Sequence, residues 1–408
     1  MNSATPALLA LLLVCSLPAM AIVAADSGLD GSGEPDGSVQ DDVPRTPLEI
    51  ENTTNRLQLG ETTHGYAGAT PNLGSVFAST DEELRVDHEQ YVFVERGFDT
   101  ASSTEREEMI EAAHSRITDR TAELEEREET VVRQHANGEK SDDELVRSLL
   151  EIYHEASVLL DGLDRLEERA DDVVGYSLSS NQVRENTRAL EAHRTTIKSE
   201  LAASSADLEA DDRFEVLIQT SEEGYRLSII EGETYISETT RFDNYDPEAP
   251  DQFAGTDRDA YDYAGELYPW AAEHGSPNYL AAGSIHDISF TANEFDIRMY
   301  IDGGTGEVYR ELQRLSIDSL PIKEHETWSQ DGLELSTRTT PANGPVEVTV
   351  TDAETGEPES STIAVDGHEL GETESDGTLW IIPPIGEYEL AAETQTGGIN
   401  VTTETPGG

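Results

Sequence analysis

The sequence predicts a multi-domain protein with both helices and strands. An antiparallel helical bundle or coiled coil is followed by an α+β antiparallel sheet carrying one helix, and then by an all-β C-terminal part. Three observations predict this order. Apolar residues recur at helical spacing before residue 212, the spacing becomes strand-like after it, and closely spaced turn signals begin at about Gly332.

The first 25 residues are typical of a signal peptide. An uncharged apolar run, Ala7–Val14, ends at Pro18 and is followed by small residues up to the first acidic residue, Asp26. The run is too short to span a bilayer and no later segment is long enough, so no membrane span is expected after signal cleavage. The only cysteine, Cys15, is a candidate for lipidation in an imperfect lipobox, or else a plain signal-peptide residue. The expected location is extracellular or at the cell surface.

The charge of the chain limits its partners. Asp and Glu number 85 against 26 Lys and Arg, which gives a formal net charge of -59. Such a chain repels nucleic acid and anionic membranes. Molar salt would screen its self-repulsion, since the Debye length falls to about 3 Å at 1 M salt. Lysine occurs only at Lys140, Lys198 and Lys323, and this preference for arginine resembles proteins of salt-accumulating archaea.

The segments before the helices are predicted to be poor in regular structure. Residues 26–47 are rich in Gly, Ser, Asp and Pro, which predicts an acidic, disordered linker. Residues 48–100 mix polar turns with short apolar pieces and are expected to form an irregular N-terminal segment.

Residues 101–211 form the predicted helical coiled domain. Ser141 and Glu144 have the spacing of a capping box, and Gly175 is a plausible helix stop. Between them lies a stripe of apolar residues spaced alternately by four and three: Leu145, Leu149, Ile152, Ala156, Leu159, Leu163, Leu166, Ala170 and Val173.

Two more helices are predicted beside this one. The preceding helix has Ile110, Ile117, Leu124 and Val131 a heptad apart, and a third helix after Ser179 or Ser180 has Val183, Leu190, Ile197 and Leu201 on one face. Because the connections are short, the three helices are expected to fold back on one another in one chain. A parallel dimeric coiled coil is the alternative.

Residues 212–325 form the predicted α+β domain. The expected strands are Phe214 to Thr220, Tyr225 to Glu231, Thr234 to Thr240, Ile285 to Ala292, Phe295 to Asp302 and Glu307 to Leu312. One helix is expected from about Asp257 to Glu273, with the aromatic pair Tyr268 and Trp270 packing on the sheet rather than lining a groove. The hairpin Tyr300 to Tyr309, with its Asp-x-x-Thr-Gly-Glu-Val pattern, is similar to the terminal hairpin of PepSY domains.

Residues 332–408 form the predicted C-terminal domain. Turn motifs at Thr355-Gly356, Asp366-Gly367, Asp376-Gly377 and Ile385-Gly386 separate short alternating segments. Their order resembles the carboxypeptidase-regulatory-like, transthyretin-like β-sandwich, which implies an Ig-like or transthyretin-like fold.

The chain as a whole also resembles an uncharacterised haloarchaeal family of exported proteins. The similarity lies in the signal segment, Asn52–Leu57, the coiled helices, Tyr268-Pro269-Trp270 and the β-sandwich. It implies a location and an architecture, and it carries over no activity and no functional residue.

The chemistry-bearing residues form no recognisable catalytic or metal-binding motif. The ten histidines show no spacing that puts two ligands on one helix face, and His114, His135, His154 and His193 are expected at surface or flanking positions of the helices. Gly303 to Gly306 lies between two strands, which predicts a hairpin turn rather than a phosphate cradle. No cofactor is expected.

Two sequons, at Asn52 and Asn400, are candidate N-glycosylation sites.

The function that these observations favour is a non-enzymatic exported, salt-adapted protein that acts as a binding or structural module toward envelope or extracellular proteins. The PepSY-like hairpin implies an alternative, a peptidase inhibitor or chaperone. A carboxylate-based hydrolase is a further alternative, although carboxylates are so numerous that their proximity in sequence carries little information. The oligomeric state is left open.

Overall fold

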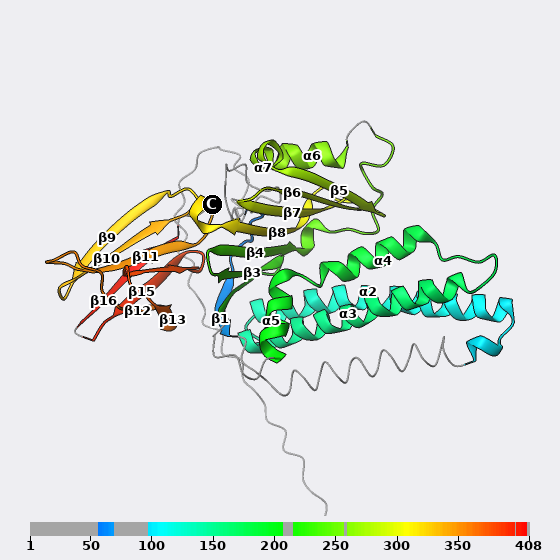
Figure 1. Ribbon diagram of the computed structural model, residues 1–408, viewed down its shortest axis with the longest axis horizontal. Coiled ribbons are helices and arrows are strands. Elements are labelled where there is room, and N and C mark those ends of the chain that lie inside the picture. The colour runs from blue at the N-terminus through cyan, green and yellow to red at the C-terminus, as the bar shows by residue number, and fades with distance from the viewer. Residues whose placement is uncertain (1–55, 69–96, 207–214, 257–258, 396, 406–408) are drawn as a thin grey trace, which may run out of the picture. The chain divides into compact units, whose positions relative to one another are not determined.

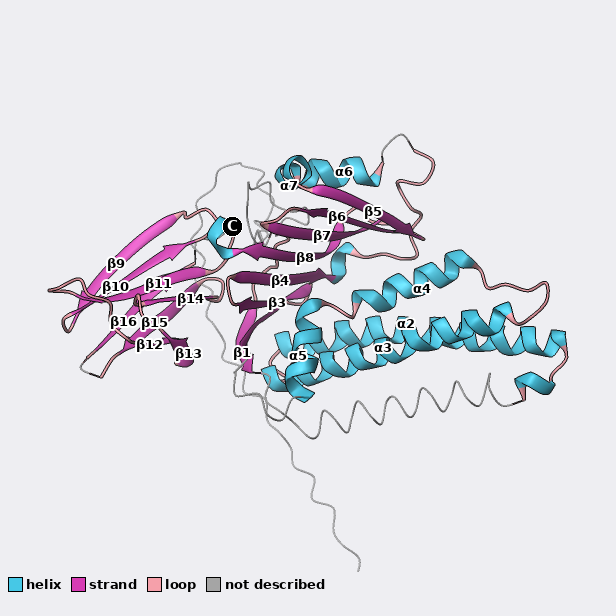
Figure 2. Ribbon diagram, in the orientation of Figure 1, coloured by secondary structure: helices cyan, strands magenta, loops and turns pink. Residues whose placement is uncertain are grey.

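The computed structural model describes residues 56–68, 97–206, 215–256, 259–395 and 397–405. The chain divides into residues 1–42 and 43–408, and every described residue belongs to the second unit. Helices occupy its N-terminal part and antiparallel sheets its C-terminal part, which confirms the predicted order of structure (Figure 2).

Two long helices dominate the N-terminal part. They are α2, Ser103–Ala136, and α3, Asp142–Asp171, and they pack against each other on either side of a short turn. Each begins with a capping box, in which the N-cap serine and a glutamate three residues later satisfy each other's backbone amides. The glutamates are Glu105 and the predicted Glu144.

The apolar stripe predicted for α3 is buried along its whole length, from Leu145 to Val173. Its central residues pack against Ile110, Ile117 and Leu124 of α2. Each fully buried Leu or Ile stabilises such a core by roughly 1.5–3 kcal/mol relative to an exposed one. The heptad spacing therefore predicted this contact correctly.

The predicted third helix is wrong in one respect, because it is two helices. They are α4, Ser180–Ala192, and α5, Thr196–Ala206. Two side chains from the sheet form hydrogen bonds with the backbone at the break between these helices. Glu238 accepts a 2.7 Å hydrogen bond from the Ile197 amide at the start of α5, and Arg310 donates to the Ala192 carbonyl at the end of α4. Helix ends leave such groups without intrahelical partners, so the two contacts favour a break at this point.

The second layer is an eight-stranded antiparallel sheet with the order β1-β2-β3-β4-β8-β7-β6-β5 (Figure 1). Its strands are β1 Thr63–Gly68, β2 Glu215–Thr220, β3 Gly224–Glu231, β4 Thr234–Arg241, β5 Ser276–Ala282, β6 Ile285–Thr291, β7 Phe295–Asp302 and β8 Val308–Ser316. The six predicted strands are all present. The two edge strands, β1 and β5, were not predicted.

The single helix predicted from Asp257 to Glu273 is also wrong as one element. It consists of α6, Ala260–Leu267, and α7, Pro269–His274. Pro269 is the first residue of α7, where its missing N–H costs nothing, but it cannot continue α6. Tyr268 between the two helices is fully buried, in agreement with the expected packing on the sheet.

Both faces of the sheet are covered. Helices α6 and α7 pack on one face, where Leu267 and Ala271 meet Ile288 and Phe290 of β6. Helices α2, α3 and α5 pack on the other, where Leu149 and Ile197 meet Ile229 of β3. The sheet is thus the middle layer of this part of the protein.

The C-terminal part is a β-sandwich of two four-stranded sheets, ordered β14-β11-β10-β9 and β13-β12-β15-β16. The strands are β9 Glu324–Gln330, β10 Leu333–Thr339, β11 Val346–Asp352, β12 Thr362–Val365, β13 His368–Glu372, β14 Thr378–Ile381, β15 Glu387–Glu393 and β16 Gly398–Glu404. The sandwich was predicted to start at residue 332, but its first strand, β9, already begins at Glu324.

The turns of the sandwich follow their sequence signals. Asp366 and Gly367, between β12 and β13, have φ angles of 48° and 80°. Positive φ at both central residues defines the type I′ turn that Asp-Gly pairs favour.

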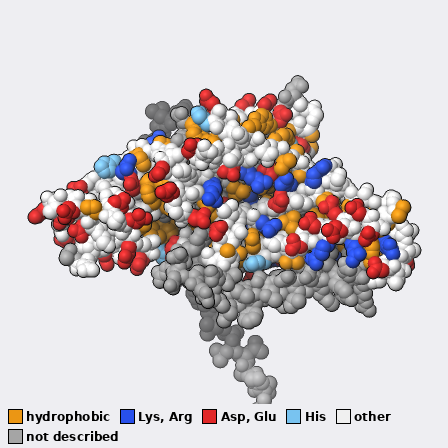
Figure 3. Space-filling model, viewed as in Figure 1, with side chains coloured by type: hydrophobic (Ala, Val, Ile, Leu, Met, Phe, Trp, Pro, Cys, Tyr) orange, Lys and Arg blue, Asp and Glu red, His pale blue; other side chains and the backbone are white. Residues whose placement is uncertain are grey.

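Acidic side chains are spread over both the helical and the β-rich parts on the face drawn in Figure 3. None of the described helices is long and apolar enough to cross a bilayer.

Candidate functional site

Strand β5 forms an open edge of the eight-stranded sheet. It pairs with β6 on one side, and no described strand pairs with its other side. Six of its seven residues are exposed, and two of them, Tyr279 and Leu280, are large hydrophobic residues with exposed fractions of 38% and 42%. An edge strand of this kind presents backbone N–H and C=O groups that can pair with another chain.

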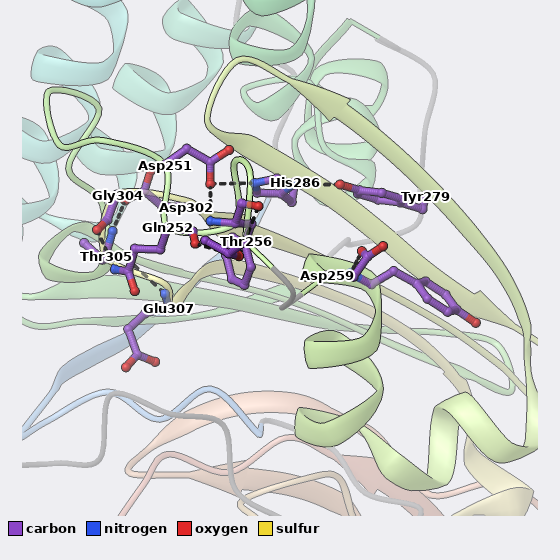
Figure 4. Close-up of polar contacts among 12 residues, drawn as sticks. Asp251, Gln252, Thr256, Asp259, Tyr279, His286, Asp302, Gly304, Thr305 and Glu307 are labelled. Carbon is purple, nitrogen blue, oxygen red and sulfur yellow. Dashed lines mark hydrogen bonds and ion pairs between the residues drawn. The ribbon is translucent and has the colours of Figure 1, made fainter.

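A chain of polar contacts orients the ring of Tyr279. Its hydroxyl lies 2.9 Å from Nδ1 of His286, and Nε2 of His286 lies 3.3 Å from Oδ1 of Asp251 (Figure 4). His286 is buried on β6 and also packs edge-on against the ring of Phe253. The orientation of the exposed ring is therefore fixed by the buried His286, which in turn contacts Asp251.

The surroundings of Tyr279 are acidic and aromatic. The ring of Tyr261 on α6 lies 6.5 Å away, centroid to centroid. Partial burial and the carboxylates of Asp259 and Asp251 raise the pKa of Tyr279. Tyr279 is thus a neutral phenol at neutral pH.

The segment that carries Asp251 is fastened to the β7–β8 hairpin. The Gln252 amide donates to the Gly303 carbonyl at 2.8 Å, and its side chain donates to the Gly304 carbonyl at 2.7 Å. Gly303 is required here, because a Cβ atom would collide with the Asp251 carboxylate and the Ser284 carbonyl. The glycine-rich string Gly303 to Gly306 lies between β7 and β8, which confirms the predicted hairpin turn.

Asp302 holds the hairpin itself. It is fully buried, and its Oδ2 accepts hydrogen bonds from the amides of Thr305, at 2.8 Å, and Asp246, at 3.0 Å. These contacts connect the hairpin to the loop that follows β4. The Asp-x-x-Thr pattern thus has a local structural role, which is to fix the turn and the loop packed against it.

A second polar cluster lies between the helices and the sheet, around the buried Glu128 of α2. Its Oε1 accepts a 2.6 Å hydrogen bond from the Tyr225 hydroxyl of β3 and pairs with Lys198 of α5. Its Oε2 pairs with Arg310 of β8 at 2.9 Å and lies 3.3 Å from Nδ1 of His193.

Electrostatics favour the charged form of Glu128. Burial alone would raise the pKa of this carboxyl, but the charges of Lys198, Arg310 and His193 outweigh it and hold the pKa well below the usual value. The group is fully enclosed, so the cluster is a structural connection rather than a reactive site.

The four histidines were expected at surface or flanking positions of the helices, and a surface position is wrong for three of them. His114, His135 and His193 are buried, with exposed fractions of 7%, 2% and 1%, and only His154 is partly exposed. Glu128 of α2 is buried as well, with an exposed fraction of 1%. His114, His135 and Glu128 are buried because α2 also packs against α4 and the sheet. His193, at the end of α4, is buried beside Glu128.

A signal for these residues exists in the sequence. His114, Thr121, Glu128 and His135 are seven residues apart, and they fall four residues after Ile110, Ile117, Leu124 and Val131. These four residues therefore repeat with the same seven-residue period as the apolar ones and lie on the same side of the helix. Polar residues at such a repeat indicate a row of buried polar side chains.

The residues proposed from sequence as modification sites are separate from both clusters. Asn400 is exposed on β16, and its side-chain amide donates a 2.8 Å hydrogen bond to Glu389. Asn52 and Cys15 lie outside the described residues. No group of three or more His, Cys, Asp or Glu within the described ranges is arranged to hold a metal ion.

Three known family models match segments that together cover most of the chain. Residues 216–321 match a family of unknown function, DUF7094, and residues 324–401 match an archaeal fibronectin-III type-like domain. The sandwich is therefore similar to fibronectin-III type-like domains of archaea. A search of the curated proteins finds no match.

The N-terminal match is the longest of the three. Residues 1–210 match the model of a domain of unknown function, DUF7096, and this is more than half of the 408 residues. The chain is an archaeal multidomain protein with a C-terminal β-sandwich, and it belongs to the DUF7096 family.

Proposed function

We propose that this protein is a non-enzymatic, exported binding module that holds an extended segment of another envelope or extracellular protein along the outer edge of β5. The observation that carries the proposal is the exposure of β5, with Tyr279 and Leu280 among the exposed large hydrophobic residues of the described chain. Strand addition to such an edge uses backbone hydrogen bonds for affinity and alternate side chains for specificity.

The contrast with β9 strengthens this proposal. Strand β9 is also an edge strand, and six of its seven residues are exposed. It carries Glu324, His325 and Glu326, and charged side chains on an edge are a common protection against unwanted pairing. Strand β5, Ser-Pro-Asn-Tyr-Leu-Ala-Ala, has no charged residue at all. Its edge lacks the protection that the same chain places on β9.

An extracellular, high-salt setting fits the sequence. The apolar run Ala7–Val14 supports export, and the net charge of -59 and the scarcity of lysine support a haloarchaeal origin. In molar salt the long-range repulsion between acidic proteins is screened, so short-range contacts at an edge strand decide which partner binds.

The helices are proposed to form a bundle within one chain rather than a parallel dimeric coiled coil. The polar heptad positions of α2 are occupied by contacts with the same chain, as in the pairs Glu128–Arg310 and His135–Thr220. A parallel dimer would need these positions of α2 to contact a second α2 helix, and contacts within the chain already bury most of them.

A hydrolase is the weaker proposal. Two of the carboxylates with perturbed pKa values, Glu128 and Glu311, are buried, and Glu311 is enclosed by the Tyr268 hydroxyl and the Leu57 amide. A catalytic carboxylate must reach its substrate within hydrogen-bond distance, which neither position allows.

A pull-down in molar salt tests the binding proposal, with tagged full-length protein and an envelope or culture fraction from its source. Leu280→Lys places a charge on the β5 edge, and Thr327→Lys is the matched change on β9. We expect the Leu280 variant to lose the partner that the wild type and the Thr327 variant retain. A photo-crosslinker at position 280 should join that partner to β5. Equal recovery with both variants, or no recovered partner, would contradict the proposal.

The PepSY-like hairpin supports a second candidate, a peptidase inhibitor or chaperone. The hairpin Tyr300 to Tyr309 anchors the loop that carries Asp251, and through it the side chains beneath Tyr279. An exposed edge strand also resembles the extended conformation in which peptidases bind substrates. Secreted peptidase activity from the same source, measured with and without excess protein, tests this. Unchanged activity would leave only the general binding function.

A further inference from the structure

We propose that the β5 edge is selective for a segment in which basic residues alternate with apolar ones, the basic side chains lying beside Tyr279 and Asp259. This inference rests on the proposed function, because it names the chemistry of the segment that β5 would hold. The two faces of β5 differ in a way that predicts such alternation.

The face that carries Tyr279 is suited to a cation. Tyr279 presents an exposed ring whose orientation is fixed by His286, and Asp259 is exposed at the start of the neighbouring helix α6 (Figure 4). Asp251 completes the acidic surroundings from the other end of the polar chain. Within the described residues, no Lys or Arg forms an ion pair with Asp251 or Asp259. An aromatic ring beside carboxylates is a favourable site for Arg or Lys.

The helices above this face add negative charge. The exposed residues of α6 and α7 include Asp262, Glu266 and Glu273, and no Lys or Arg lies in either helix. An acidic segment bound here would place like charges at contact distance from these side chains, where screening by salt is weakest. A basic segment is complementary in charge.

The opposite face of β5 has a different character. Leu280 is directly opposite Asp287 of β6 in the strand register, and Asp287 is already paired with Arg298, at 2.8 Å, and Arg188, at 3.6 Å. The local charges on this face are therefore balanced, and Leu280 offers an apolar contact. Since strand side chains alternate between faces, one docked segment would meet both surfaces in turn.

Synthetic peptides test the selectivity directly. The probes are a six-residue peptide alternating Arg and Val, its Glu–Val counterpart and its Thr–Val counterpart, each titrated against the full chain in molar potassium chloride. We expect the Arg–Val peptide to bind at least about tenfold more tightly than the Glu–Val peptide, and to slow hydrogen exchange of the β5 amides.

Three variants separate the site from general attraction to an acidic protein. Asp259→Asn keeps a residue that caps α6 well, and Tyr279→Leu removes the ring; each should weaken Arg–Val binding by about two- to fivefold. Glu324→Gln removes one exposed charge from the other edge strand, β9, and should leave binding unchanged. If all three variants weaken binding equally, the attraction is general and the site is wrong.

The peptides also distinguish this inference from the function on which it rests. If the Arg–Val and Thr–Val peptides protect the β5 amides with equal affinity, β5 is a docking edge without charge selectivity, and the inference fails alone. If none of the peptides protects β5, both the inference and the proposed docking edge fail. Self-association that protects β5 without peptide would identify a second copy as the occupant and would overturn the inference.

Discussion

Arg310 of β8 and Glu128 of α2 form a buried ion pair, with 2.9 Å between Nη2 and Oε2, where the helical layer meets the eight-stranded sheet. The same arginine donates to the carbonyl at the end of α4, and the same carboxylate pairs with Lys198 at the start of α5. One pair of residues therefore connects three helices to the sheet. The apolar stripe between α2 and α3 does not supply this connection.

Replacing Glu128 with Gln should destabilise the protein strongly. The substitution leaves Lys198 and Arg310 buried without their counter-charge, and removing one partner of a buried pair costs about 3–5 kcal/mol. Urea unfolding in molar salt, followed by helical circular dichroism, measures the loss. Glu126→Gln, an exposed change two residues away on α2, is the control and should shift stability by less than about 0.5 kcal/mol. Equal stability of the two variants would contradict the role assigned to the cluster.

Glu125 should make stability fall as the pH rises toward neutrality. Burial and the neighbouring charge of Glu128 raise the pKa of Glu125 to about 7, despite opposing contributions from Arg310 and a hydrogen bond with Tyr245. Because the folded pKa lies above the unfolded value of 4.5, the contribution is complete below pH 4.5 and is lost as the pH passes 7. The full change is at most about 3 kcal/mol.

The difference between wild type and Glu125→Gln isolates this group. Wild-type stability should decline between pH 5 and 8 relative to the variant. His193, whose pKa is lowered by burial, acts in the opposite direction below the ordinary histidine value of 6.5, and it is common to both proteins. Parallel stability curves across this range would show that Glu125 titrates normally.

Salt should stabilise the helices more than the sandwich. Compacting a chain with a net charge of -59 increases repulsion, and counter-ions in molar salt screen it. Helical circular dichroism of the purified chain should be strong in molar potassium chloride and fall on dialysis to low salt at neutral pH. Lowering the pH at low salt should restore part of it, since protonation removes the same repulsion. Helical content that is constant from molar to millimolar salt would refute the salt dependence.

Gly224 should tolerate no side chain. It begins β3, and a Cβ atom there would collide with the Thr240 carbonyl of the paired strand β4. Gly224→Ala must therefore separate two central strands, and we expect a loss above about 3 kcal/mol or failure to fold. Gly232, in the following turn, has φ of 57° but open space around it, so Gly232→Ala should cost only about 1 kcal/mol. Similar losses for both would show that close packing is not the cause.

The sequence predicted the elements whose stabilising contacts are apolar and regularly spaced. The stripe from Leu145 to Val173 specifies α3, and short segments bounded by the turn signals Glu223-Gly224 and Glu231-Gly232 specify β2, β3 and β4. The Asp366-Gly367 pair specifies its turn through backbone conformation alone. In each of these, local residues determine the structure without help from distant ones.

The remaining features depend on contacts between distant residues. The break between α4 and α5 is held by Glu238 and Arg310, which lie 41 and 118 residues from their partners in the helices. Strand β5 has no alternating pattern and includes Pro277, so its strand character comes from pairing with β6. In the sequence, Glu128 cannot be told apart from the exposed acidic residues beside it, because the sheet that buries it lies far along the chain.

The contacts that link Tyr279, His286 and Asp251 could not be predicted from the sequence either, because they also join distant residues. Asp251 is 35 residues from His286, and the β7–β8 hairpin brings them together. No spacing rule connects these residues, whereas Asp302 and Thr305 could be linked to a turn from their own pattern.

Hydrogen exchange at the β5 amides tests the central proposal most directly. The full chain would be measured in molar potassium chloride, alone and with the partner that the pull-down recovers from its source. We predict that those amides of Asn278 to Ala281 that point away from β6 exchange rapidly in the free protein and slow at least about tenfold on binding, while those of β9 do not change. Exchange at β5 that is the same with and without the partner, or protection confined to another surface, would contradict the assignment of β5 as the binding edge.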